Sequence, residues 1–138
     1  DSEMHVVDTI SSAIRRTNLR EIKGLVFRDY VLGRKLDIEN VEVLESVETI
    51  VNTISFHDKD SQQKLMDLIT YIDFTDPRSV VLLLDSRILV KIGNLDDINY
   101  KISSLRSIYF GNIKETESGI LDFTVGANPI FSPFAGGN

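Results

Sequence analysis

Apolar side chains recur every three or four positions in two stretches of the chain. In residues 43–54, and again in 95–110, this spacing places them on one face of an α-helix. The first helix is expected to begin at Asn40, because Asn is a favoured N-cap residue. For the second helix, Asn94 and Asp97 resemble a capping arrangement. The pattern therefore predicts two amphipathic helices.

Other stretches carry β-branched and aliphatic runs that are typical of strands. The clearest signal is a hairpin, in which residues 80–84 and 88–92 flank the short polar segment 85–87. Strands are also expected over 69–74 and 120–125. Earlier strand-like runs occupy 4–7, 13–16, 23–27 and 30–32.

The order of these elements predicts an α+β fold, in which a mostly antiparallel sheet has its helices packed on one face. The last strand, 120–125, is expected at or near a sheet edge, because no further strand is predicted after it. Residues 127–138 are expected to form an irregular apolar tail.

Composition narrows the chemistry that is open to the chain. Its 138 residues fit one domain, and the absence of Cys removes disulfides, zinc–thiolate sites and thiol nucleophiles. The net charge of −6 argues against general affinity for nucleic acids. Seven of the fifteen Lys and Arg residues nevertheless lie between Arg15 and Lys35. This basic segment could bind a cell-wall polymer or anionic lipid, or it could consist of outward-facing strand positions.

The sequence contains no recognisable catalytic motif, and no catalytic, cofactor-binding or metal-binding residue is assigned. The segment His57–Asp60 places one His beside two Asp residues, which could hold a divalent ion. It also precedes a short helix expected over 61–68, where Asp is a favoured cap, and we favour the cap. The acidic residues of the 43–54 helix are interpreted as a solvated face, with a carboxylate-based enzyme as the competing hypothesis.

The strand 120–125 carries little that protects an edge from pairing with another chain. Asp122 is its one acid, and no Pro follows before Pro129. Such an edge, with the apolar residues Ile130, Phe131 and Phe134 after it, suits strand addition by a partner. Equally, the tail could fold back and cover the sheet, and the residues alone leave both possibilities open.

Short motifs in this order resemble the extracytoplasmic β-domain of the FtsQ/DivIB family of bacterial cell-division proteins. They are Ile22-Lys23-Gly24-Leu25, Leu32-Gly33-Arg34-Lys35-Leu36, Ile72-Asp73, Val90-Lys91-Ile92-Gly93, Tyr100-Lys101-Ile102 with Leu105, and Gly119-Ile120-Leu121-Asp122-Phe123. The likeness covers residues 20–126, with residues 1–19 as a strand-rich lead-in and 127–138 as the tail. The family's Pro before the first motif is missing here.

The resemblance implies a non-catalytic divisome scaffold without a cofactor, which binds DivIC/FtsB-type and FtsL-type proteins by strand addition and supports septum formation. The partner-binding residues that it implies are Leu121, Phe123, Val125, Gly126, Ile130 and Phe131. Either Phe131 or Phe134 matches the family's late aromatic residue.

The resemblance also implies a single-pass membrane protein, with this domain on the extracytoplasmic side at the division septum. No run of 18 apolar residues is present, and the chain begins at Asp1, so the membrane anchor is expected outside these residues. The alternative function is a cell-wall or lipid-binding module that uses the basic segment 15–35.

Overall fold

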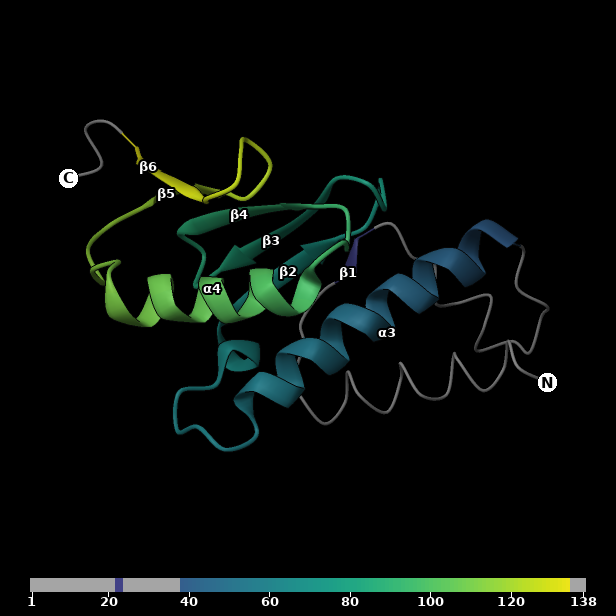
Figure 1. Cartoon of the computed structure of the whole chain (residues 1–138), viewed down its shortest axis with the longest axis horizontal. Coiled ribbons are helices and arrows are strands. Elements are labelled where there is room, and N and C mark those ends of the chain that lie inside the picture. The colour runs from purple at the N-terminus through teal and green to yellow at the C-terminus, as the bar shows by residue number, and fades with distance from the viewer. Residues whose placement is uncertain (1–21, 24–37, 135–138) are drawn as a thin grey trace.

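A six-stranded sheet and two long helices make up the part of the chain that the structure describes, residues 22–23 and 38–134 of a computed structural model (Figure 1). The expected strands 4–7, 13–16 and 30–32 lie outside these residues, as does nearly all of 23–27. The helices are α3 (Ile38–Asp58), the 3₁₀-helix η1 (Leu65–Leu68) and α4 (Ile98–Gly111). The strands are β1 (Ile22–Lys23), β2 (Ile69–Asp73), β3 (Val80–Leu84), β4 (Ile88–Gly93), β5 (Gly119–Asp122) and β6 (Ile130–Pro133).

The strands lie side by side in the order of the sequence. The β2–β3, β3–β4 and β5–β6 pairs are antiparallel, whereas β1–β2 and β4–β5 are parallel. A parallel pair needs a crossover, and α3 and α4 supply the two crossovers. The two parallel pairs run in the same direction and both crossovers step the same way along the sheet, so right-handed crossovers would share one face. Figure 1 shows both helices below the sheet. The predicted α+β fold with a mostly antiparallel sheet is confirmed.

The predicted hairpin is the centre of the sheet. Its turn is closed by a hydrogen bond from the Arg87 N–H to the Leu84 carbonyl (3.0 Å). Asp85 and Ser86 both have positive φ, 52° and 55°, which is the backbone of a type I′ turn. This turn matches the right-handed twist of the two strands. It allows β4 to begin at Ile88, only a few residues after β3 ends at Leu84.

The core consists of aliphatic side chains from α3 and α4 and from alternate positions of the strands. In β3, Val80, Leu82 and Leu84 are buried, while the residues between them are partly exposed. The same alternation continues in β4 and β5, as expected for a sheet with one covered face. Ile102 and Leu105 of α4 join the same cluster. The hydrophobic pattern therefore selects the face of each strand that packs against the helices.

Asp58 occupies the corner between α3 and η1, and it is the buried charged residue of the described part of the chain. Its carboxylate accepts the backbone N–H groups of Leu65 (2.8 Å) and Met66 (3.0 Å) and pairs with the Arg106 guanidinium of α4. Asp58 therefore caps the short helix, as the favoured interpretation of the His57–Asp60 segment requires, and ties it to α4.

The helix ends differ from the prediction in three places. The helix expected over 61–68 is reduced to the single turn of η1, since the segment before it is held by Asp58 instead of by helical bonds. Asn40 is not the N-cap of α3, because that helix begins at Ile38. The N-cap of α4 is Asp97, but its side chain makes no capping bond, and Asn94 accepts the Asp96 N–H (3.0 Å) in a local turn.

Candidate functional site

Strand β5 is the second strand from the edge of the sheet, between β4 and β6. The Gly119 N–H donates to the Arg87 carbonyl (3.1 Å) and the Phe123 N–H to the Lys91 carbonyl (3.0 Å), which ties one side of β5 to β4. Its other side pairs with β6. The strand 120–125 thus lies near a sheet edge, as expected, but both of its sides are paired, so β5 itself offers no free edge to a partner. The edge belongs to β6, which lies in the segment that was expected to be an irregular tail.

The hydrogen-bond alternation of the β5–β6 pair shows which backbone groups of β6 point away from the sheet. The Phe134 N–H donates to the Ser118 carbonyl (2.8 Å), and Ser132 is two positions before Phe134. In an antiparallel pair, bonded and non-bonded residues alternate, so Phe134 and Ser132 direct their backbone groups to β5. Phe131 and Pro133 therefore direct theirs outward. Within the described residues, no strand pairs with that outer side.

The expected partner-binding residues divide into a buried and an exposed set. Leu121 and Phe123 are 1% and 9% exposed and belong to the core, so these two side chains present almost no surface to a partner. Val125 and Ile130 are 56% and 54% exposed, and Gly126 is exposed between them in the β5–β6 connection. The exposed members thus lie in the connection between β5 and β6 and at the first residue of β6.

The two aromatic residues of the tail have different environments. Phe131 is half-buried and packs against the core, whereas the Phe134 side chain is 51% exposed. Sequence reasoning missed the edge position of Pro133 and the strand that contains it. A signal was present, because Pro is tolerated in a sheet chiefly at edges, and Pro129 and Pro133 bracket an apolar run.

Asp122 stabilises the start of the β5–β6 connection. Its Oδ1 accepts the Thr124 N–H (2.8 Å) and the Thr124 hydroxyl (2.6 Å). Burial acts to raise the pKa of Asp122, but the two bonds from Thr124 and the charge of Lys91 outweigh it and hold the pKa below its usual range. The ionised carboxylate therefore holds the chain at the point where it leaves β5.

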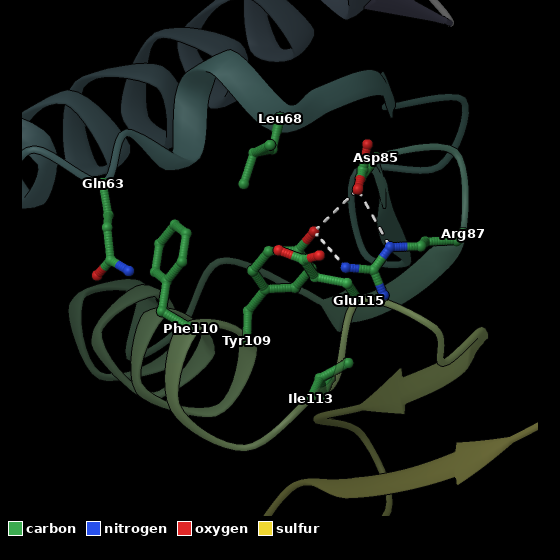
Figure 2. A pocket seen from close by; sticks show the side chains of 8 residues that line it. All are labelled: Gln63, Leu68, Asp85, Arg87, Tyr109, Phe110, Ile113 and Glu115. Carbon is green, nitrogen blue, oxygen red and sulfur yellow. Dashed lines mark hydrogen bonds and ion pairs between the residues drawn. The ribbon is translucent and has the colours of Figure 1, made fainter.

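Arg87 stabilises the segment that leads from the end of α4 into β5 (Figure 2). Its Nη1 donates to the carbonyls of Lys114 (3.0 Å) and Glu117 (2.7 Å), and its Nη2 donates to the Tyr109 hydroxyl (3.0 Å). Nε pairs with Asp85 at 3.1 Å. The guanidinium therefore positions the loop that leads into β5.

Arg87, Tyr109 and Asp85 line a cavity of about 560 Å³ between η1, α4 and the β3–β4 turn. Tyr109 contributes its hydroxyl, and burial raises the pKa of that group, although the neighbouring Arg87 acts to lower it. Two carboxylates, Asp85 and Glu115, also lie on the wall, as Figure 2 shows. The Arg87 and Tyr109 groups are bonded to protein atoms, and Asp85 is paired with Arg87, so the arrangement holds the fold together.

A second cavity, of about 320 Å³, adjoins the edge. It lies between the start of α4 and the β5–β6 connection, with the half-exposed Tyr100 ring and Pro129 on its walls. Lys101 closes one side, and its ammonium donates to the carbonyls of Ile92 (3.0 Å) and Asn94 (2.9 Å). The hollow has a mixed lining, since Asp96 and Asp97 lie on its walls beside Tyr100 and Pro129.

Other functional predictions find no site in the described residues. Across residues 22–23 and 38–134, no group of three His, Asp or Glu side chains is placed to hold a metal ion. The basic segment 15–35 lies outside the described residues except for Ile22 and Lys23. In the same part of the chain, no helix combines the length and apolar character needed to cross a membrane.

Comparisons of the chain with protein-family models, with curated proteins and with solved structures give no match.

Proposed function

We propose that this chain is a non-catalytic interaction domain, which binds its partner by adding an extended segment of that partner to the outer edge of β6. The observation that carries the proposal is the outward direction of the Phe131 and Pro133 backbone groups at the last strand of the sheet. Unpaired backbone groups at an edge are a template for a further strand, and they supply affinity through main-chain hydrogen bonds.

The side chains around the edge support the same function. Ile130, the first residue of β6, and Phe134, the residue after its end, are both exposed. Val125 is exposed in the connection between β5 and β6. Exposed apolar residues next to an open edge give an added strand something to bury, which supplies specificity in strand addition.

From the family resemblance, we propose that the partners are DivIC/FtsB-type and FtsL-type proteins. The domain then acts as a divisome scaffold on the extracytoplasmic side of the cell membrane, where it supports septum formation. The proposal places the added strand at β6, in the segment 127–138, and not at the edge 121–126 that the resemblance implies, because both sides of β5 are paired.

The test is a pair of substitutions at Phe131. Phe131→Pro removes the outward N–H and places a ring where the partner strand would lie, whereas Phe131→Ala removes the same aromatic side chain and retains the N–H. The affinity of each variant for the extracytoplasmic segment of the DivIC/FtsB-type protein from the same organism is measured by calorimetry, after circular dichroism has shown that both are folded.

Phe131→Pro is expected to weaken binding at least about tenfold relative to Phe131→Ala, since a net hydrogen bond is worth about 1 kcal/mol and the ring adds a clash. Equal affinities of the two folded variants would show that the partner does not pair with this edge.

A further inference from the structure

The outer edge of β6 has more hydrogen-bond acceptors than donors. Over residues 129–133, the outward positions are Phe131, Pro133 and, one step before the strand, Pro129. All three have a carbonyl group, but the two Pro residues have no N–H. The segment therefore presents three acceptors and a single donor, the Phe131 N–H.

We infer that Pro129 and Pro133 make this edge selective for a strand from a different protein and prevent it from pairing with a second copy of itself. The occupant is an extended segment without Pro at the positions that face β6. The inference rests on the proposed function in assuming that β6 accepts a strand at all, and it adds which strand the edge accepts.

The number of outward N–H groups limits self-pairing in any direction and register. Two copies that pair through residues 129–133 bring one outward N–H each, so they form at most two hydrogen bonds and leave the other carbonyls without a donor. An unmatched polar group in an interface costs free energy. A different strand with its own N–H groups can serve all three carbonyls and also accept the Phe131 N–H.

The exposed apolar residues make such protection necessary. Ile130 and Phe134 are both more than half exposed beside the edge, and an exposed apolar edge strand is prone to self-association. Natural proteins place Pro on edge strands for this reason. Here the two Pro residues occupy the same side of the strand as the one donor, which leaves the middle of the edge open.

The test replaces both Pro residues in the intact chain. Pro129→Ala with Pro133→Ala restores two outward N–H groups, and Pro77→Ala, in the turn between β2 and β3, is the matched control. Sedimentation velocity over one concentration series is expected to show a monomer for the wild type and the control. The double variant is expected to form a dimer with a dissociation constant at least about tenfold lower than any dimer of the wild type.

Adding Phe131→Pro to the double variant locates the dimer, because the Pro ring would lie where the strand of the second copy pairs in the middle of the edge, and it is expected to weaken the dimer at least about tenfold. A double variant that stays monomeric overturns the inference, and so does a triple variant that dimerises as tightly as the double variant. These measurements need no partner. If the double variant dimerises through β6 while the wild type fails to bind the DivIC/FtsB-type segment, the role of the Pro residues stands and the proposed partner is wrong.

Discussion

Gly119 and Pro133 face each other across the β5–β6 pair at a distance that excludes a side chain on Gly119. A Cβ atom there would lie 2.8 Å from the Pro133 Cα and 2.4 Å from the Ser132 carbonyl oxygen. Gly119 is therefore required so that β6 can approach β5, and the position of the candidate edge depends on it.

Replacing Gly119 by Ala is expected to lower the free energy of unfolding by about 1–3 kcal/mol, because the backbone of β6 has to move away from the new methyl group. Urea denaturation measures the change. Gly126→Ala is the matched control, since nothing lies within 4 Å of a Cβ at that position. If the two variants are equally stable, the close packing of β6 on β5 is incorrect.

Asp58→Ala is expected to destabilise the protein by about 3–5 kcal/mol. The substitution leaves the largely buried Arg106 guanidinium without its carboxylate and the N–H groups of Leu65 and Met66 without their acceptor. Thermal and urea unfolding measure the loss. Asp60→Ala, at an exposed position of the same segment, should stay within about 0.5 kcal/mol of the wild type, and a similar loss in both would contradict the capping role.

Asp122 should make stability depend on pH in the acid range. Its folded-state pKa is held below the ordinary value of 3.8, so the stabilisation is fully present above that pH and is lost as the pH falls through the lower folded-state value. Unfolding free energies of the wild type and Asp122→Asn, measured from neutral to acid pH, should therefore converge at low pH. A constant difference between them would show that ionised Asp122 does not stabilise the connection.

Ser86→Gly is expected to stabilise the β3–β4 hairpin by about 1 kcal/mol, since Gly adopts positive φ without the steric cost that Ser86 bears at 55°. The gain is reduced by loss of the exposed contact between the Ser86 and Thr70 hydroxyls (3.3 Å). Ser79→Gly, at a turn position without positive φ, should be neutral or destabilising. A loss of stability in Ser86→Gly would argue against the type I′ turn.

The spacing of apolar residues was sufficient to predict the helices and strands that have one buried and one exposed face. The hairpin 80–84 with 88–92 and the two amphipathic helices were predicted because period-2 and period-3.6 spacing reflect burial directly. The helix expected over 61–68 is reduced to one turn, because the Asp58 carboxylate binds the N–H groups of Leu65 and Met66, seven and eight residues further along the chain.

The sequence by itself determined the α+β class, the core face of each long element and the absence of Cys chemistry. It could not decide which strand is the edge. β6 has only partly buried and exposed side chains, so its sequence carries no burial pattern. It forms because the backbone N–H and C=O groups of Ile120 and Asp122 in β5 point away from β4 and need hydrogen-bond partners. That requirement arises only when the sheet is assembled, and it turns the tail into the strand on which the proposed function depends.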